Sequence, residues 1–242
     1  MRPVALVVGG SRRVGAATAI ELARAGFDLL VSWRSDERGA LEVSRHAEAM
    51  GVACRTFELD LATFDGRSLP AALDGARLDA LVLNAAAWQP TPWGAIDQGS
   101  LHRLLQVNAV APALLVQALA NRLAASTLPG GGCVVAVGDA HAAGTPVRGY
   151  AGYMMSKAAL HQLVQQLAAE LAPRVRVNGV LPGVVAWPDD MPEASRASIL
   201  QRVPLARAGE PADVARLVRF LCLEAPFITG ALIPVDGGRS IR

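Results

Sequence analysis

Two residues four positions apart, Tyr153 and Lys157, have the types and spacing for proton-transfer chemistry. They open an apolar stretch with helical spacing, and positions i and i+4 share one face of a helix. An ammonium beside a phenol favours the phenolate, so we expect Lys157 to lower the pKa of Tyr153 and make it a usable proton donor near neutral pH. Many surface helices carry this pair, so the spacing alone is a weak signal.

The composition strengthens this interpretation. Of the 23 basic residues, Lys157 alone is a lysine, and Tyr153 is one of only two tyrosines. Lysine and arginine are not interchangeable, because lysine offers a compact, rotatable ammonium on a flexible stem. The competing interpretation is a lone surface lysine left by chance. Upstream of the pair, an apolar run over 133–137 predicts a buried strand that ends near an acid, Asp139.

Length and composition indicate a globular protein of one large domain or two small ones. The 242 residues are 52% apolar and 18% charged, and the net charge of +2 gives no argument for a nucleic-acid partner. We expect no signal peptide and no membrane span, because apolar runs are short. The three cysteines, Cys54, Cys133 and Cys222, are predicted to be buried, reduced thiols of a cytoplasmic protein, with no metal site.

Predicted strands and helices alternate along the whole chain. Strands are expected at 1–8, 27–33, 53–59, 80–83, 133–137, 175–181 and 231–235, and helices at 16–25, 40–50, 101–124, 152–171, 193–201 and 211–223. Alternation implies right-handed crossovers and a parallel sheet covered on both faces. The predicted fold class is therefore α/β, with residues 1–242 forming a single doubly wound (Rossmann) domain.

A glycine-containing turn joins the first expected strand to the first helix. It runs from Gly9 to Gly15, with Arg13 between them. Glycines let the backbone approach a pyrophosphate, and a helix N-terminus favours anions. A plain strand–helix connection is the alternative.

The end of the second expected strand bears on the choice of cofactor. The sequence there is Trp33-Arg34-Ser35, whereas an NAD enzyme usually places an acid at this point. An arginine with a hydroxyl suits a 2′-phosphate, so NADPH is the predicted cofactor. Asp36 is interpreted as a solvated loop residue. Asp60 and Leu61 are candidates to contact adenine, although a helix-capping role for Asp60 is nearly as plausible.

Over essentially its whole length the chain resembles the short-chain dehydrogenase/reductase family. The resemblance rests on the Gly9–Gly15 turn and on Asp60, Asn84-Ala85-Ala86, Asn108, Tyr153-xxx-Lys157, Asn178, Pro182-Gly183, Ile228-Thr229-Gly230 and Asp236-Gly237-Gly238. It implies a proton relay through Asn108, a general acid at Tyr153 and a ribose-binding cation at Lys157. It also implies cofactor contacts from Gly9, Ser11, Arg12, Arg13, Val14, Gly15, Asn84, Ala85, Ala86, Pro182 and Gly183. A homotetramer built on the helices 101–124 and 152–171 is the implied assembly.

Departures from the usual family pattern narrow the resemblance. Val8 replaces the usual threonine of the turn, Arg13 its middle glycine, and Asp139 stands near the place of the usual serine. These features look like the pteridine reductase branch, which includes dihydromonapterin reductases. Local strings agree: Trp88 with Pro90-Thr91-Pro92, Asp189-Asp190-Met191-Pro192, Val203-Pro204-Leu205 and the tail Val235–Ser240. Fourteen residues separate Asp139 from Tyr153, one more than those enzymes usually have.

The resemblance implies NADPH-dependent reduction of a dihydropterin, such as dihydromonapterin, dihydrobiopterin or dihydrofolate. Asp139 and Tyr153 would supply or relay the proton, and a partly desolvated Asp139 would have a raised pKa suited to donation. Trp88 would stack on the pterin, with further substrate contacts from Arg13, Gly183 and Met191. The segment 183–192 would form a lid, and Arg239 or Arg242 would reach a neighbouring subunit's site.

Two other functions stay open from the sequence. One is a carbonyl reductase acting on substrates such as 3-oxoacyl thioesters; the other is a protein that binds NADPH without turnover. Individual residues also have plainer interpretations. Trp88 could be a core or lid residue, Arg13 could contact phosphates only, and Asp139 could be a helix cap. His141 is more often a solvated loop residue than a base.

Overall fold

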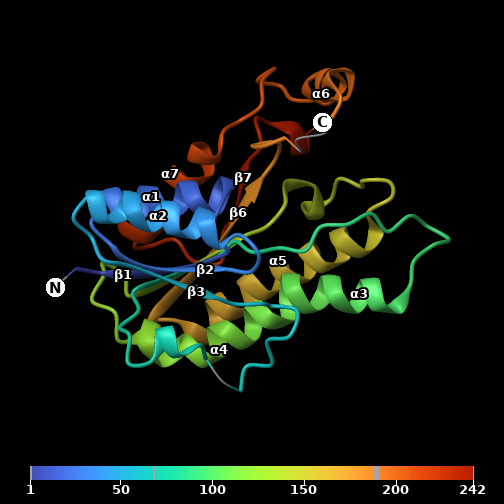
Figure 1. The fold of residues 1–242 in the computed structure, drawn as a ribbon. Helices are drawn as coiled ribbons and strands as arrows, with labels where there is room; N and C mark the ends of the chain where they lie inside the picture. The colour runs from blue at the N-terminus through green and yellow to red at the C-terminus, as the bar shows by residue number, and fades with distance from the viewer. Residues whose placement is uncertain (1, 68, 188–190, 242) are drawn as a thin grey trace.

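Seven parallel strands form one sheet in the part of the chain that the structure, a computed structural model, describes (residues 2–67, 69–187 and 191–241; Figure 1). The strand order is β3-β2-β1-β4-β5-β6-β7, and every pairing is parallel. The strands are β1 (Val4–Val8), β2 (Asp28–Trp33), β3 (Cys54–Glu58), β4 (Ala80–Leu83), β5 (Gly132–Val137), β6 (Val175–Pro182) and β7 (Leu232–Val235). This is the doubly wound topology that the sequence predicts.

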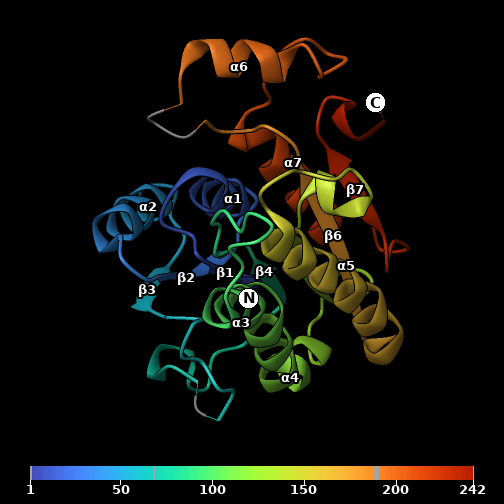
Figure 2. The same cartoon turned by 90° about the vertical axis from the view of Figure 1, so that its right-hand side faces the viewer.

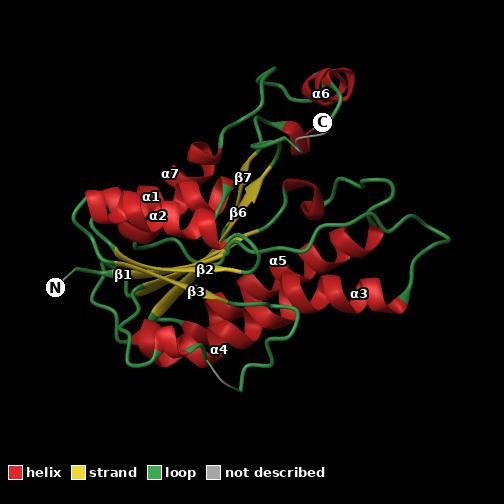
Figure 3. Cartoon of the chain, viewed as in Figure 1, coloured by secondary structure: helices red, strands yellow, loops and turns green. Residues whose placement is uncertain are grey.

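Helices cover both faces of the sheet (Figures 2 and 3). One face carries α1 (Arg13–Arg24), α2 (Glu37–Ala49) and α7 (Pro211–Leu223), and the other carries α3 (Gln98–Leu105), α4 (Ala111–Ala124) and α5 (Ala151–Leu171). Successive side chains of β1 enter two separate cores, with Leu6 and Val8 on one side and Ala5 and Val7 on the other. A strand that is buried on both faces is a continuous apolar run in the sequence, and such runs predicted the strands.

The expected elements are all present, and their ends shift by a few residues. The long helix starts at Gln98 rather than 101, because the Asp97 side chain accepts a hydrogen bond from the Ser100 N–H and caps it. A single π turn, η2 (Gln106–Val110), interrupts it before α4. The first strand begins at Val4, and Met1 lies outside the described residues.

The helical run Gln98–Ala124 is long and apolar enough to cross a membrane by length and composition alone. These two properties alone do not make the run a membrane span, because a core helix can share them. The side chains of this run belong to the core, because Leu104, Leu115, Leu119 and Leu123 are fully buried against the sheet and α5. The run is a core helix.

The cysteines follow the expectation only in part. All three are free thiols, and Cys133 and Cys222 are buried. Cys54 is only partly buried, because it opens β3, the edge strand of the sheet.

Helix α6 (Glu193–Leu200) stands apart from the two helical layers, beyond the carboxyl ends of the strands (Figures 1 and 2). It has no buried residue. The strand order reverses between β1 and β4, and such a reversal opens a crevice at the carboxyl ends of the strands. The fold thus predicts a binding site between this edge of the sheet and α6.

At the opposite, amino ends of the strands, a buried acid, Asp79, holds the start of β1. Its carboxylate accepts hydrogen bonds from the Val4 N–H at 2.9 Å, the Ser126 hydroxyl at 2.7 Å and the Arg77 guanidinium at 2.9 Å. The side chain is fully buried. Removing it would leave several of these donors without a partner.

We expect Asp79→Ala to lower the free energy of unfolding by about 2–4 kcal/mol, because a buried, fully paired carboxylate is lost. The matched control is Asp65→Ala, whose ion pair with Arg67 is exposed and should contribute within about 1 kcal/mol. Urea unfolding of both variants measures the difference. Equal losses in the two variants would contradict a structural role for Asp79.

Candidate active site

A cavity of about 810 Å³ lies along the carboxyl ends of the central strands. Most residues predicted to bind cofactor or substrate line it: Gly9, Ser11, Arg12, Arg13, Val14, Trp33, Arg34, Ser35, Asp60, Leu61, Asn84, Ala85, Ala86, Trp88, Asp139, Tyr153, Lys157, Gly183 and Met191. Three predicted residues do not line it, namely Gly15, Asn108 and Pro182. The structure therefore gathers residues that are up to 230 positions apart in the sequence (Gly9 and Arg239) into one site.

The glycine turn leaves no room for side chains. A Cβ at Gly9, whose φ is +76°, would lie 2.8 Å from the Cβ of Ala85, and a Cβ at Gly15 would collide with the Gly9 carbonyl oxygen. Asn84 holds the turn from the next strand, donating its side-chain N–H to the same Gly9 oxygen at 2.7 Å. The result is a close-packed backbone cradle at the N-terminus of α1, which fits a pyrophosphate. Gly15 does not line the cavity, but its lack of a side chain lets α1 pack against the turn.

Arg13 takes over the conformation of the glycine that it replaces. Its φ is +49°, in the left-handed region that glycine favours and other residues rarely adopt. Arg12 is the extended N-cap residue of α1. Both arginines line the cavity at the helix N-terminus. The turn thus keeps its backbone path and adds positive charge where phosphates would bind.

At the end of β2, Trp33 occupies the last strand position, and Arg34 and Ser35 follow it into the cavity wall. Asp36 was expected to be merely solvated, but its carboxylate accepts a hydrogen bond from the Gly39 N–H at 3.0 Å and caps α2. One carboxylate oxygen of Asp36 is thus used by the helix, and the residue also lines the cavity. Arg34 and Ser35 remain as the side chains at the position where an NAD enzyme would use an acid.

Asp60 combines both roles that the sequence left open. Its Oδ1 accepts from the Ala62 N–H at 2.9 Å, which fixes the turn after β3, and the residue also lines the cavity beside Leu61.

The reacting end of the cavity is built from β5 and α5. The Tyr153 hydroxyl donates to Oδ2 of Asp139 at 3.1 Å, and the Lys157 ammonium donates to the Val137 carbonyl at 2.8 Å. Oδ1 of Asp139 accepts from the His141 N–H at 2.8 Å, so Asp139 also caps the short helix η3 (Ala140–Ala143). The helix-cap interpretation of Asp139 is confirmed through Oδ1, and Oδ2 contacts Tyr153, whereas a role of Asp139 in proton transfer stays a prediction.

Two expectations about pKa values were wrong: a lowered pKa for Tyr153 and a raised pKa for Asp139. Burial raises the pKa of Tyr153, and the Asp139 carboxylate raises it further, so the phenol keeps its proton. Burial also raises the pKa of Asp139. Three effects outweigh burial and hold that pKa below its ordinary value: the hydrogen bonds from His141, the charge of His141 and the hydrogen bond from the Tyr153 hydroxyl. The acid is the ionised partner and the tyrosine is the protonated one.

Lys157 is buried, with 3% of its surface exposed. Burial lowers its pKa to about 8, against the opposing attraction of Asp139. The ammonium therefore titrates close to neutral pH, within reach of physiological conditions.

His141 was interpreted as a solvated loop residue, which was wrong. Its side chain is only 13% exposed, and its Nδ1 lies 3.3 Å from Oδ1 of Asp139. The sequence offered no signal for this contact, because the turn of η3 that brings the two together is only four residues long.

Asn108 is the one predicted catalytic residue that does not line the cavity. Its side-chain amide bonds the Ala87 backbone in both directions, at 2.8 and 2.9 Å, and donates to the Ser156 hydroxyl at 2.8 Å. It lies in the π turn η2 and fixes α5 and the loop after β4 relative to each other. The relay role implied by the family resemblance stays a prediction.

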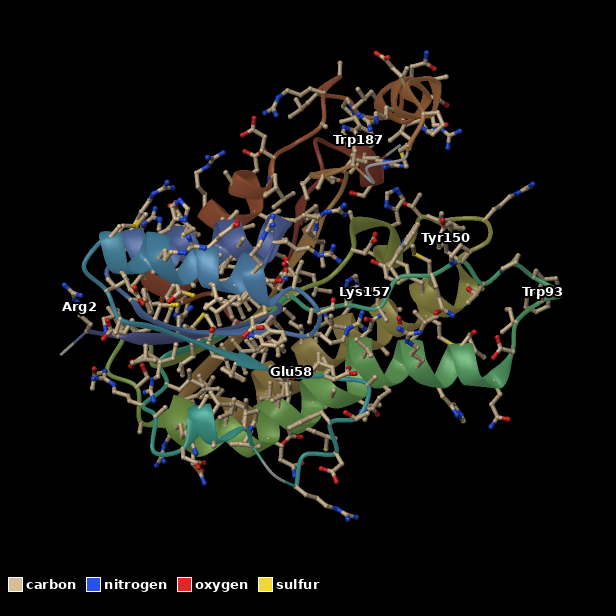
Figure 4. All side chains as sticks on the ribbon, viewed as in Figure 1. Arg2, Glu58, Trp93, Tyr150, Lys157 and Trp187 are labelled. Carbon is tan, nitrogen blue, oxygen red and sulfur yellow. The ribbon has the colours of Figure 1, made fainter. Side chains whose placement is uncertain are left out.

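Aromatic side chains form the outer wall of the cavity. Trp88 is 58% exposed and stacks on Tyr150, with ring centroids 5.1 Å apart, so it is not a core residue. Trp187 lies on the segment that leads to α6, and the Arg196 guanidinium of α6 lies 5.8 Å from its ring centroid. Figure 4 shows Lys157 in the middle of the molecule, Trp187 above it and Tyr150 to its right. Of the predicted lid, residues 188–190, including Asp189-Asp190, lie outside the described residues.

Arg239 reaches the cavity of its own chain. It belongs to η4 (Arg239–Ile241), and the Asp236 carboxylate shapes that turn by accepting from the N–H groups of Gly238 and Ser240. Burial and the nearby Arg202 lower the pKa of Arg239, while Asp139 and Asp236 oppose that shift. A role in a neighbouring subunit is therefore not required for this residue, and Arg242 lies outside the described residues.

The chain is similar to several known proteins over nearly its whole length. The family model described as enoyl-(acyl carrier protein) reductase matches residues 9–240. Protein FixR of Bradyrhizobium diazoefficiens is 35% identical over 98% of this chain and 87% of its own. Pteridine reductase 1 of Leishmania tarentolae is 32% identical over 99% of this chain and 96% of its own.

Among solved structures, the acetoin dehydrogenase YohF of Salmonella typhimurium superposes with a TM-score of 0.89 at 30% identity, covering 100% of this chain and 98% of that one. The fold of this chain thus recurs in a solved structure over its full length. The chain belongs to the short-chain dehydrogenase/reductase family, and it is an oxidoreductase that works with a nicotinamide cofactor.

Proposed function

We propose that this enzyme reduces a dihydropterin to its tetrahydro form with NADPH. The observation that carries the proposal is the carboxylate of Asp139, which stands near the place where the family usually has a serine. This carboxylate accepts a hydrogen bond from the Tyr153 hydroxyl. Trp88 and Tyr150 add a flat aromatic wall on the same cavity. Pteridine reductase 1 matches almost the full length of the chain, which supports the same substrate class.

The chain's own residues divide the work of the reaction. Bound NADPH supplies the hydride, which goes to the carbon of a C=N bond. Tyr153 gives its proton to the adjacent ring nitrogen, so one C–H and one N–H bond form as the double bond is lost. The ionised Asp139 accepts hydrogen bonds from the amino and ring N–H groups of the pterin and orients it. Gly183 and Met191 contact the substrate from the lid side.

Lys157 supports the phenolate that Tyr153 leaves behind. In this proposal the ammonium stabilises that phenolate, because the two residues share one face of α5. The raised pKa of the phenol then favours prompt recovery of a proton from water. Lys157 also offers donors for the nicotinamide ribose.

The preference for NADPH rests on Arg34 and Ser35. They follow β2 at the place where a ribose 2′-hydroxyl or 2′-phosphate would lie, and the neighbouring carboxylate of Asp36 caps α2 through Oδ1. A guanidinium and a hydroxyl suit the phosphate.

A carbonyl reductase is the second candidate. It is favoured by the high structural similarity to an acetoin dehydrogenase. In that case Tyr153 would donate to a carbonyl oxygen. A homotetramer and a cytoplasmic location remain parts of the proposal.

The first prediction concerns the substrate. With NADPH we expect turnover of 7,8-dihydromonapterin, 7,8-dihydrobiopterin or dihydrofolate, and little turnover of acetoacetyl thioester or diacetyl. Asp139→Ser and Asp139→Asn should lower kcat on the dihydropterin by about 100-fold or more, because the charged acceptor is lost. Loss of NADPH absorbance measures each rate. Turnover of the carbonyl substrates alone would reject the pterin proposal.

The second prediction concerns the cofactor. Arg34→Ala should raise KM for NADPH by about 10–100-fold and leave KM for NADH nearly unchanged, because only the 2′-phosphate loses its partner. Arg38→Ala is the control, since Arg38 lies close by on α2 but pairs with Glu42 at the surface. Equal effects on both cofactors would contradict the role of Arg34.

The third prediction concerns pH. The ammonium of Lys157 is present below its pKa of about 8 and lost above it, so kcat/KM should fall as pH rises through about 8. In Lys157→Arg, whose guanidinium stays charged, that alkaline limb should vanish even if the rate is low. A pH–rate profile of both proteins is the measurement. An unchanged limb in Lys157→Arg would assign it to another group.

The fourth prediction follows from the same burial. The pKa of Lys157 is lower in the folded protein, at about 8, than its ordinary value of 10.5. The charged lysine therefore lowers the free energy of unfolding increasingly as pH falls from 10.5 to 8, and the full penalty applies below pH 8. Lys157→Met should therefore be inactive yet more stable at pH 7, by about 1–3 kcal/mol. Urea unfolding at pH 7 and at about pH 10 should show the gain shrinking at the higher pH.

A further inference from the structure

His161 lies on the same face of α5 as the two reacting residues. It follows Tyr153 by eight positions and Lys157 by four, so the three side chains are stacked along the helix. It is buried, with 6% of its surface exposed. It does not line the cavity, and nothing in the proposed mechanism uses it.

The ring of His161 binds the backbone at the end of β5. The last hydrogen bond between β5 and β6 joins the Gly138 N–H to the Val180 carbonyl at 2.8 Å. The next N–H along the chain, that of Asp139, is donated to Nε2 of His161 at 3.3 Å. The imidazole thus provides a hydrogen-bond acceptor for the first backbone N–H beyond the last β5–β6 hydrogen bond.

Gly138 makes room for this contact. A Cβ at position 138 would collide with Nε2 of His161 and would lie 2.5 Å from Cδ2 of Leu181. The ring therefore lies directly against the strand end, and the glycine before Asp139 is matched to the histidine on α5.

The charged groups around the ring favour its neutral form. Burial and the ammonium of Lys157, one helical turn away, lower the pKa of His161 to about 4, and the carboxylate of Asp139 opposes them only in part. With Nε2 accepting from Asp139, the ring proton must be on Nδ1. A protonated ring would donate from both nitrogens and could not accept the N–H.

We propose that His161 is a positioning residue that fixes Asp139 by its backbone N–H, so that the carboxylate faces the Tyr153 hydroxyl. The neutral ring does this without placing a second positive charge beside Lys157. The inference depends on Asp139 acting in the reaction, as proposed above, but not on which substrate is reduced.

The first test compares His161→Leu with His161→Gln on whichever substrate the wild type reduces. Leucine fills the space without an acceptor and should lower kcat by about 10–100-fold, with KM for NADPH within about two-fold. Glutamine has an oxygen that can accept the N–H and should recover most of the loss. His102→Leu, on the exposed side of α3, is the control and should behave as wild type. Equal losses for leucine and glutamine would overturn the proposal.

A double-mutant cycle separates positioning from a general structural effect. In an Asp139→Ala background, His161→Leu should change kcat by less than about two-fold, because the residue that it positions is gone. Additive losses would show that His161 acts by another route.

A readout that does not need turnover completes the test. Long-range ¹⁵N NMR of the histidines should show His161 as the neutral Nδ1–H tautomer at pH 6, with protonation only near pH 4. An Nε2–H tautomer, or protonation near the ordinary histidine pKa of about 6.5, would overturn the proposal. This measurement still decides if no tested substrate is reduced, so failure of the proposed function and failure of the inference are distinguishable.

Discussion

The site depends on one buried charge, the ammonium of Lys157. An ion held away from water is expensive unless other groups compensate it. Here the Val137 carbonyl accepts from it at 2.8 Å, and Asp139, two residues further along the same strand end, supplies the opposite charge. The ionised acid, the protonated phenol and the ammonium form one electrostatic unit, so the state of each depends on the others. The strand end of β5 and the first turns of α5 must keep their relative positions for this unit to exist.

Buried amides keep those positions. Asn108 joins the loop after β4 to Ser156 of α5, and Asn84 joins β4 to the glycine turn after β1. Asn178 does the same at the far side, bonding the Ile228 carbonyl and the Ala231 N–H. Each amide has both a donor and an acceptor, so a single side chain can satisfy two backbone groups of a loop that has no sheet partner. These family motif residues fix the loops around the cavity, and Asn84 also lines it.

The sequence predicted the fold well because the signal was local. Doubly buried strands are continuous apolar runs, and the glycines of the turn are required by close backbone contacts that recur wherever this turn binds phosphates. The pKa values could not be predicted in the same way. The sequence suggests that Lys157 acts on Tyr153, but the carboxylate of Asp139 is the direct partner of the phenol, and the contact of His141 with Asp139 arises only when η3 folds. Arg239 was within the recognised tail, yet its place in the cavity of its own chain depends on the turn that Asp236 shapes.

The ionised state of Asp139 bears directly on the substrate. A ketone or thioester carbonyl presents only acceptor oxygens, so a carboxylate at that point would face the developing negative charge and oppose the reaction. A pterin presents amino and ring N–H groups, which a carboxylate accepts, while its reacting nitrogen can still take a proton from Tyr153. A serine hydroxyl, which both donates and accepts, would suit the carbonyl better. Holding the acid ionised through the His141 contacts is therefore useful for an N–H-rich substrate and harmful for a carbonyl, which is the physical reason for preferring the pterin over the ketone.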